Sequence, residues 1–285
     1  MPPISTPTVR QRRLGAELRK LREAAGISTQ EAAALLGVNR TRIPNIEAGR
    51  FRTSPERVRT LATNYGCTDT QLVEALVDIT KERGNHWWES YRELLPPAFL
   101  DVAELEHHAT AMRMFVMVHI PGLLQTAEHA RAVFESSLLP LARDEVELRA
   151  MHRMRRQEVL TLRRNPPKYT AIVHEAALHI QFGGPKVARE QLNHLLDISE
   201  RDNNVTIRAI PFGADGFAGP GQPIFYANGP VPQLDTVQLD SFHGSTFIDS
   251  HTDLADYRAL LDKMEALCLP ENKTRDLIHG IAQKL

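Results

Sequence analysis

The feature that most limits what this chain can fold into is a pair of short segments joined by a glycine, within TQEAAALLGVNRTRIPNIEAGR (residues 29–50). Ser28 and Glu31 form a Ser-x-x-Glu capping box, which satisfies two otherwise unpaired N–H groups at the start of a helix. Gly37 ends that helix, since glycine adopts the positive φ of a helix terminus without steric cost. The pattern predicts a helix, a tight turn and a second helix in immediate succession.

The second helix of the pair is predicted to pack closely on its neighbours. Ala33 is small where two helices must approach, and Ile43 and Ile46 would anchor the second helix on a core. A small residue, a turn glycine and apolar anchors together are typical of a helix-turn-helix. Asn39 is a favourable cap for the second helix, and Gly49 is expected to close it.

Pro44 lies inside this second helix and restricts where the helix can begin. Proline lacks a backbone N–H and crowds the preceding turn, so in a helix interior it costs about 3 kcal/mol or more. In the first turn of a helix the missing N–H costs almost nothing. We therefore expect a late or 3₁₀-like start near Thr41, which would turn Arg40 and Thr41 toward a phosphate.

Three further helices are predicted around this pair, which gives a mainly α domain of five helices over residues 1–84. Pro55 after Ser54 starts the fourth helix, and TDTQ (residues 68–71) caps the fifth. Apolar residues recur at helical spacing in the first, fourth and fifth helices: Leu14, Leu18 and Leu21; Val58, Leu61 and Tyr65; Leu72, Leu76 and Ile79.

Charge is distributed unevenly along the chain. Residues 1–85 contain 14 Lys and Arg against 9 Asp and Glu, whereas the remainder contains 20 basic and 26 acidic residues. A basic head on an acidic remainder indicates that the head binds a polyanion, without identifying which one.

The stretch from Thr29 to Arg50 resembles the helix-turn-helix of the Xre/Cro-type family, and the similarity extends over about residues 10–80. The resemblance implies that the second helix of the pair enters the major groove of double-stranded DNA. The family commonly has a small polar residue where this chain has Pro44. The residues that the resemblance assigns to DNA binding are Gln30, Asn39, Arg40, Thr41, Arg42, Asn45, Arg50 and Arg52.

These residues are expected to divide between bases and phosphates. Arg42 and Asn45 are the expected base contacts, because arginine pairs with guanine and asparagine with adenine. Gln30 is expected on a phosphate or a base, and Arg50 and Arg52 on phosphates, which position a protein without reading sequence. The alternative is that the arginines form a solvated helix face.

Residues 85–285 are predicted to form a larger α+β domain, because the hydrophobic period switches repeatedly between helical and extended. Trp87 and Trp88 near its start are interpreted as buried anchors rather than ligand-stacking residues. The predicted helices cover residues 101–112, 121–134, 141–164 and 185–201 and two C-terminal segments, and the predicted strands cover residues 113–120, 169–173, 205–211, 223–227 and 236–241.

Roughly residues 86–270 resemble the large C-terminal domain of WhiJ-like regulators of actinomycetes. PGLLQT (Pro121–Thr126) is the most specific element of this similarity. The resemblance implies a regulator of development or secondary metabolism that often works beside a small partner protein.

Several apparent sites are set aside. In HEAALH the spacing of His174 and His179 places them about 140° apart on a helix, which does not suit a zinc pair. The glycine-rich segment 212–223 lacks a phosphate-loop ending and is interpreted as a mobile loop over a cleft. Cys67 and Cys268 are expected to be reduced thiols. The arginines between residues 149 and 164 alternate with glutamates, which favours a solvated long helix over a second nucleic-acid surface.

Together these patterns predict a cytoplasmic, homodimeric, sequence-specific DNA-binding transcriptional regulator. Its C-terminal domain is expected to supply dimerisation and to sense a small-molecule effector or bind a partner. The alternative is an antitoxin-like protein that binds a small partner protein and autoregulates its own operon. No pattern supports an enzyme, a metal or cofactor site, or a membrane span.

Overall fold

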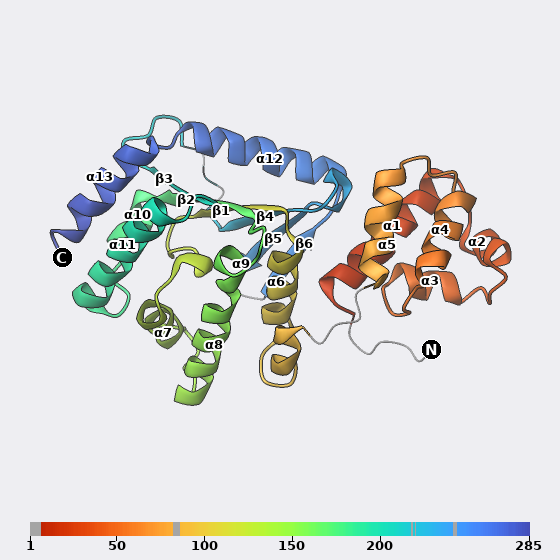
Figure 1. Ribbon diagram of the computed structural model, residues 1–285, viewed down its shortest axis with the longest axis horizontal. Coiled ribbons are helices and arrows are strands. Elements are labelled where there is room, and N and C mark those ends of the chain that lie inside the picture. The colour runs from red at the N-terminus through yellow and green to blue at the C-terminus, as the bar shows by residue number, and fades with distance from the viewer. Residues whose placement is uncertain (1–6, 82–85, 218, 220, 242–243) are drawn as a thin grey trace. The chain divides into compact units, whose positions relative to one another are not determined.

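The computed structural model describes residues 7–81, 86–217, 219, 221–241 and 244–285 (Figure 1). The chain forms two compact units, Met1–Leu105 with Pro230–Leu234 and Glu106–Gly229 with Asp235–Leu285. The predicted boundary at residues 84 and 85 lies outside the described residues and stays a prediction.

The first unit begins with the five predicted helices. They are α1 (Val9–Ala24), α2 (Thr29–Leu36), α3 (Arg42–Glu47), α4 (Pro55–Asn64) and α5 (Thr70–Lys81), followed by a 3₁₀ turn, η1 (Trp87–Tyr91), and by α6 (Pro97–His108). Trp88 in η1 is buried and Trp87 is half-buried, so Trp88 in particular has the anchoring character expected from its size.

Local capping explains where these helices begin and end. Ser28 Oγ accepts from Glu31 N at 3.2 Å while Glu31 Oε2 accepts from Ser28 N at 2.8 Å, so the predicted capping box is present. Gly37 ends α2 with φ of 66°. Thr68 does not cap α5 by its side chain in any bond the structure records; instead Asp69 Oδ1 accepts from Leu72 N at 3.0 Å.

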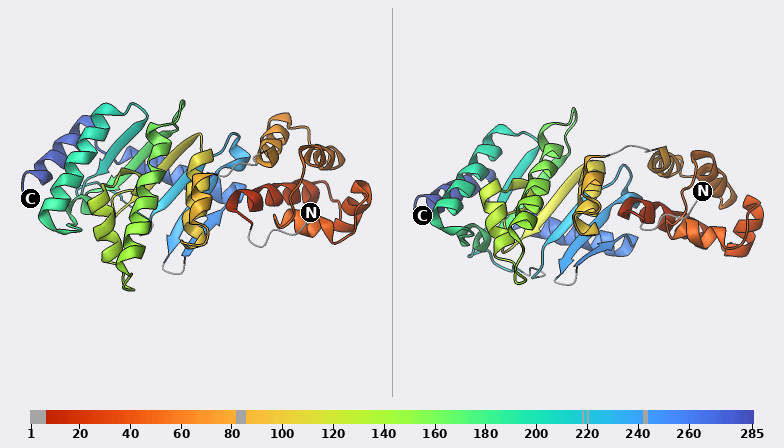
Figure 2. Two further views of the ribbon diagram at one scale, coloured as in Figure 1. Left: turned by 60° about the horizontal axis from the view of Figure 1, so that its bottom comes forward. Right: turned by 90° about the horizontal axis from the view of Figure 1, so that it is seen from below.

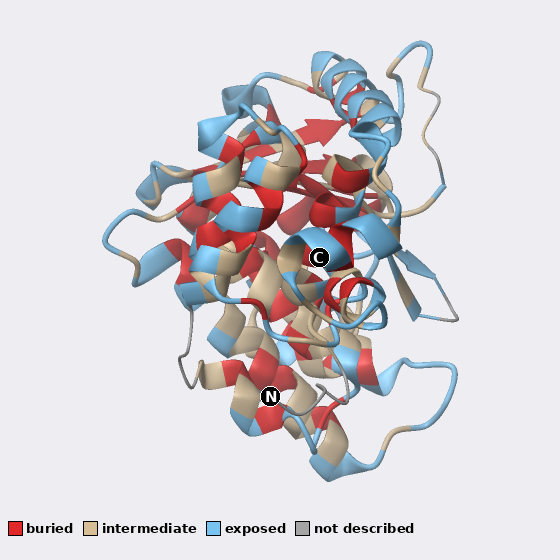
Figure 3. Ribbon diagram, turned by 90° about the vertical axis from the view of Figure 1, so that its right-hand side faces the viewer, coloured by how far each residue is buried: buried red, intermediate tan, exposed pale blue. Residues whose placement is uncertain are grey.

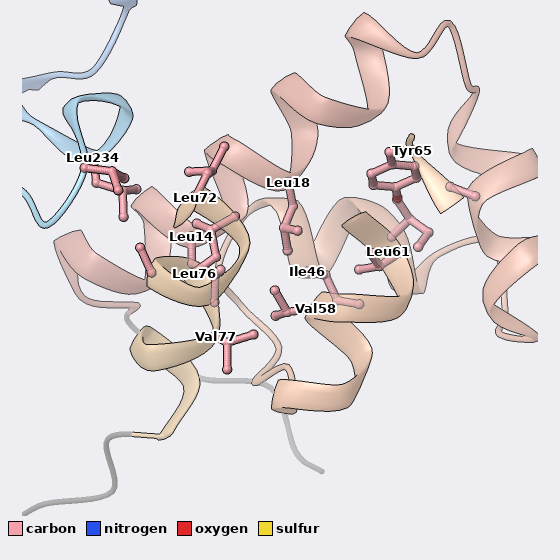
Figure 4. Close-up of a cluster of buried hydrophobic side chains, with 14 of the residues drawn as sticks. Leu14, Leu18, Ile46, Val58, Leu61, Tyr65, Leu72, Leu76, Val77 and Leu234 are labelled. Carbon is pink, nitrogen blue, oxygen red and sulfur yellow. The ribbon is translucent and has the colours of Figure 1, made fainter. Parts of the chain in front are cut away.

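The apolar residues predicted at helical spacing meet in one core. Leu14 and Leu18 of α1 lie beside Leu61 of α4 and Leu76 of α5, as Figure 4 shows. The buried members of this cluster are Leu14, Leu18, Ala32, Ala33, Ile43, Ile46, Val58, Leu61, Tyr65, Leu72, Ala75, Leu76, Val77, Val231 and Leu234.

The second unit is built on a mixed six-stranded sheet in the order β3-β2-β1-β4-β5-β6. Its strands are β1 (Ala111–Val116), β2 (Lys168–His174), β3 (Val205–Ile210), β4 (Ile224–Asn228), β5 (Thr236–Ser241) and β6 (Gly244–Ile248). The strands β1, β2 and β3 are parallel neighbours, whereas β4, β5 and β6 pair antiparallel. This arrangement confirms the predicted mainly α head followed by an α+β body.

Helices cover both faces of the sheet. Connecting segments are η2 (Gly122–Leu124), α7 (Ala127–Glu135), α8 (Arg143–Arg156), α9 (Glu158–Thr161), α10 (Glu175–His179), α11 (Gly184–Arg201), η3 (Pro232–Leu234), α12 (His251–Ala266) and α13 (Glu271–Ala282). Helix α12 crosses one face, and α7, α8 and α11 lie on the opposite side (Figures 1 and 2). Most of the sheet between them is buried (Figure 3).

Several predicted elements differ from those observed. The helix predicted over residues 101–112 is α6, which ends at His108 before β1 begins at Ala111, and the helix predicted over residues 121–134 is the η2 turn followed by α7. The strand predicted over residues 113–120 is observed as β1, which ends at Val116 where the chain bends at residues 117–119. The single helix predicted over residues 141–164 is interrupted at Gln157, which separates α8 from α9. No helix within the described ranges is long and apolar enough to cross a membrane.

Candidate nucleic-acid interface

Helix α3 begins late, as Pro44 requires. Its first residue is Arg42, whose N–H donates to Asn39 O at 2.8 Å in a 3₁₀-like turn. Pro44 is therefore the third helical residue, where its missing N–H has no intrahelical partner to lose. The prediction of a late start is confirmed. The predicted cap is wrong: Thr41 occupies the N-cap position, and Asn39 Oδ1 instead accepts from Thr41 N and Oγ1, each at 3.1 Å.

Helix α3 is held on the bundle by its two isoleucines and by a glycine in α1. Ile43 and Ile46 are 1% and 3% exposed, as their spacing predicts. Gly15 of α1 lies against the end of α3, where a Cβ atom would stand 2.2 Å from Glu47 O. Because such a contact is impossible, Gly15 sets how closely α1 and α3 approach. The sequence interpretation did not identify this role.

A buried ion pair joins the same two helices. Arg22 of α1 places Nε 2.6 Å from Glu47 Oε1 and Nη2 3.1 Å from Glu47 Oε2. Arg22 Nη1 also donates to Ile27 O at 2.8 Å. The hydrogen bond that Arg22 donates to Glu47 raises the pKa of Arg22 against the opposing effect of burial. The guanidinium is thus fully engaged inside the unit and turned away from solvent.

The outward side of α3 carries a specific set of residues. Arg40 and Thr41 are exposed, as predicted, and Pro44 and Ala48 are exposed beside them. Gln30 of α2 and the more distant Arg50 and Arg52 are also exposed. The positions Thr41, Pro44 and Ala48 follow one another at intervals of three and four, so they share one face of the helix.

Arg42 is placed differently from the prediction that it lies on the exposed side. Its side chain is half-buried, and its guanidinium carbon lies 4.3 Å from the centre of the Phe51 ring. Such a cation over an aromatic face is attracted to the ring and held in one orientation. The contact with Phe51 thus places the Arg42 side chain at the side of α3. The two residues are nine positions apart in the chain, and the sequence did not suggest that they meet.

Asn45 is likewise only half-exposed, and it stabilises its own helix. Its Nδ2 donates to Thr41 O at 2.8 Å. Its backbone carbonyl accepts from Arg50 N at 2.9 Å and from Phe51 N at 3.3 Å, which closes the turn after α3. The Asn45 side chain therefore holds the start of α3, a structural role that the sequence interpretation did not assign.

A basic hollow of about 290 Å³ lies beside Arg42. Arg52 and Arg57 line it together with Arg42, and so does Ser54, the N-cap of α4. A helix N-terminus carries partial positive charge and free N–H groups. Together with the three arginines, the N-terminus of α4 therefore favours binding of an anion in this hollow. Arg57 was missed by sequence interpretation, although the Ser-Pro helix start between two arginines is a signal that could have found it.

The sites set aside in the second unit have structural roles. His174 is the N-cap of α10, with Nδ1 accepting from Ala176 N at 3.2 Å, and His179 lies 3.4 Å from Glu175 Oε1. No group of three His, Cys, Asp or Glu suited to a metal occurs among the residues that the structure covers. Cys67 and Cys268 are free thiols, and burial raises the pKa of Cys268 to about 12.

The arginines of α8 do not form the solvated face that was predicted. Arg156 donates to Glu106 from Nε at 2.8 Å and from Nη2 at 2.5 Å, with both side chains largely buried. Arg153 points into the unit as well, whereas Arg155 is exposed. The alternation of charge along α8 was misleading because the helix packs against η2 and α7, which bury part of its basic surface.

Comparison with known families identifies both parts of the chain. Residues 13–76 match the model described as Helix-turn-helix domain, which spans α1 to α5 and marks the chain as a DNA-binding regulator. Residues 99–280 match the model described as Domain of unknown function (DUF5753). Neither a search of curated proteins nor a search of solved structures found a match.

Proposed function

We propose that this chain, which belongs to the family described as Domain of unknown function (DUF5753), is a sequence-specific transcriptional regulator that reads double-stranded DNA with α3. The observation that carries the proposal is the outward face of α3. Arg40, Thr41 and Pro44 are exposed at the start of a helix whose opposite side is buried through Ile43 and Ile46. A rigid helix presented in this way suits the major groove.

The half-buried positions of Arg42 and Asn45 change the proposed distribution of contacts. Arg40 and Thr41 take the leading base-reading roles, because their side chains extend from the exposed N-terminus of α3. Pro44 and Ala48 offer apolar contact, which suits a thymine methyl group. Asn45 is proposed to hold α3 together rather than to lead in reading a base.

The basic hollow beside Arg42 is proposed to receive a backbone phosphate. Arg42, Arg52 and Arg57 converge there with the N-terminus of α4. Phosphate contacts fix register and orientation, so this hollow would set how α3 lies in the groove. Arg50 and Gln30, which are exposed, would add contacts to phosphates or bases.

The proposal includes a homodimer and a non-enzymatic role for the C-terminal unit. One recognition helix reads only a few base pairs, and dimers of such proteins bind half-sites about 34–36 Å apart. The similarity to Xre-type heads and WhiJ-like regulators supports this organisation by resemblance only. Genome fragments bound by the purified full-length chain should contain an inverted repeat with that spacing, and a single unrepeated half-site would contradict the dimer.

Matched arginine variants test the DNA-reading role. Arg40→Ala is expected to cost about 1–3 kcal/mol of binding free energy on a DNA site recovered from the bound genome fragments, and to relax specificity at one base pair. Arg52→Ala should weaken binding to all DNA sequences alike. It should also reduce by about 1 the slope of the logarithm of the binding constant against the logarithm of the salt concentration. Arg19→Ala removes an exposed α1 charge and is the control. Equal losses for Arg40→Ala and Arg19→Ala would reject the assignment.

Purification from a native host separates this proposal from the antitoxin-like alternative. DNA-dependent recovery of specific operator fragments supports the regulator. A stoichiometric small protein that stays bound in the absence of DNA would favour the interaction protein instead.

A further inference from the structure

A cavity of about 490 Å³ lies in the second unit at the carboxyl end of β1. Strand β1 has a parallel neighbour, β2, on one side and an antiparallel neighbour, β4, on the other. In open sheets, ligands bind outside the carboxyl ends of parallel strands, where the strand order changes. The volume is within the range of about 300–1,000 Å³ that small-molecule sites have.

The walls of the cavity are mainly apolar. They include Met114, Val116, Val118, Ile120, Pro121 and Val133. Gly221, Gln222 and Pro223 complete one side, so the segment interpreted as a loop over a cleft does border one. Residues 218 and 220 of that segment lie outside the described residues, and its predicted mobility stays a prediction.

Arg153 of α8 brings a positive charge to this apolar cavity. Its Nη1 donates to Gln125 Oε1 at 2.7 Å, and its guanidinium carbon lies 4.2 Å from the centre of the Phe134 ring. Its Nε is buried and has no hydrogen-bond partner in the structure. Within the described parts of the chain, no carboxylate lies at ion-pair distance from Arg153, whereas Arg156 one turn away pairs with Glu106.

Burial of an unpaired charge is costly, and this cost lowers the pKa of a buried guanidinium. Burial, together with the charges of Arg156 and Arg149, lowers the pKa of Arg153 to about 9, against the opposing effect of Glu106 and Asp240. The nearest lining carboxylate, Asp240, is already engaged, since its Oδ1 accepts from Ser245 at 2.6 Å and from Gln238 at 2.8 Å. An incoming anion would relieve the unmatched charge of Arg153.

The neutral partner of Arg153 is rigidly held. Gln125 is buried, and its Nε2 donates to Ile120 O at 2.7 Å, so its Oε1 remains directed at Arg153. Gln157 donates to Gln125 O at 2.7 Å, which fixes the backbone of the same residue. Gln191 adds a third hydrogen bond to this segment by donating to Leu124 O at 2.7 Å. These hydrogen bonds within and around PGLLQT hold the guanidinium of Arg153 in one position at the cavity.

Two histidines lie close to the same charge. His119 lines the cavity and stacks on Phe182 at 5.0 Å between ring centres, and His129 meets the same ring at 5.7 Å. Burial lowers the pKa of both histidines, and Arg153 lowers both further. Their rings are therefore neutral near pH 7 and can each donate one hydrogen bond without adding a second charge.

We propose that this cavity binds a small organic anion with an apolar body, whose anionic group pairs with Arg153 and receives a hydrogen bond from His119. The apolar body lies against the walls contributed by β1, the turn that follows it and α7. A guanidinium pairs with either a carboxylate or a phosphate through parallel hydrogen bonds. The inference concerns the second unit alone and does not depend on DNA binding.

Calorimetric titration of the full-length chain tests the site with four probes that share a hexyl body: heptanoate, hexyl phosphate, hexan-1-ol and hexylammonium. At least one of the two anions should bind with a Kd of about 1 mM or tighter. Hexan-1-ol should bind about tenfold more weakly, and hexylammonium more weakly still, since burying a cation beside Arg153 is unfavourable. The stronger of the two anions identifies the carboxylate or the phosphate class.

Variants assign the binding to Arg153. Arg153→Met should weaken binding of the anion about tenfold or more while leaving binding of hexan-1-ol unchanged. Arg155→Met, an exposed change on the same helix, is the charge-matched control and should bind as the unaltered chain does. Val133→Phe should abolish binding of all probes by filling the cavity while Arg153 remains.

Three results would overturn the proposal: neither anion binds, hexan-1-ol binds as tightly as the anions, or Arg153→Met keeps full affinity. Circular dichroism of each variant establishes that it is folded. If Arg153→Met does not fold, the comparison of charged and neutral probes on the unaltered chain and the effect of Val133→Phe still decide the question.

Discussion

Arg22 of α1 and Glu47 of α3 form a bidentate ion pair, with Nε–Oε1 at 2.6 Å and Nη2–Oε2 at 3.1 Å. Both side chains are less than a tenth exposed, at 9% and 8%. Since a buried charge that loses its partner is left uncompensated, Glu47→Leu should destabilise the helical head by about 3–5 kcal/mol. Hydrogen exchange of peptides from α1 to α5 measures the loss.

Two further variants separate burial from charge. The double change Arg22→Met with Glu47→Leu should recover much of that stability, because no unpaired charge remains. Glu74→Ala breaks the exposed pair with Arg59, whose side chains are 45% and 55% exposed, and should cost less than about 1 kcal/mol. A similar loss for Glu47→Leu and Glu74→Ala would contradict the role of burial.

Gly15→Ala should displace α3. A Cβ at Gly15 would stand 2.2 Å from Glu47 O and 2.7 Å from Ile46 O, so the two helices must separate. We expect a loss of about 1–3 kcal/mol in the head and weaker specific DNA binding. Gly280→Ala is the control, because a Cβ there meets nothing within 4 Å, and it should stabilise α13 by up to about 1 kcal/mol. Equal behaviour of the two variants in hydrogen exchange would show that the close approach is unimportant.

Pro44→Ala should change the stability of the head by less than about 1 kcal/mol, since the first turn of α3 loses no hydrogen bond at that position. Ala34→Pro, an exposed change inside α2, should cost about 3 kcal/mol or more, because it removes an intrahelical bond. Urea unfolding followed by circular dichroism compares the two. A large stabilisation by Pro44→Ala would mean that the proline strains α3.

His129 should make the second unit sensitive to acid. Burial, with help from His119 and Arg153, lowers its pKa from 6.5 to about 4. The unfolded chain therefore binds more protons between these values, so stability is full above about pH 6.5 and falls as the pH drops toward 4. Urea unfolding at about pH 5 and about pH 7.5 measures how much free energy of unfolding is lost on acidification. In His129→Leu this loss should be smaller by a few kcal/mol than in the unaltered chain.

His152 adds to the same loss of stability below about pH 6.5 and extends it to lower pH. Burial, reinforced by Arg156 and Arg153, lowers its pKa to about 3. Removing both histidines should flatten the acid limb further than His129→Leu alone. An unchanged slope in the double variant would show that other groups control the acid response.

The sequence by itself determined the features that depend on residues within a turn or two of one another. The capping box of Ser28 and Glu31, the left-handed Gly37 and the late start forced by Pro44 are all set by local backbone chemistry. The alternation of helical and extended periods was likewise enough to predict a helical head and an α+β body, because burying one face imposes that period.

Only the tertiary structure decided where the long side chains point and which elements meet. Phe51 turns Arg42 aside from the exposed face, and Glu106 draws Arg156 inward from a helix that looked solvated. Gly15 is needed only because Glu47, far along the chain, lies against it. A flexible arginine has many rotamers of similar energy in isolation, so its position is selected by partners that packing brings together, and no local pattern contains that choice.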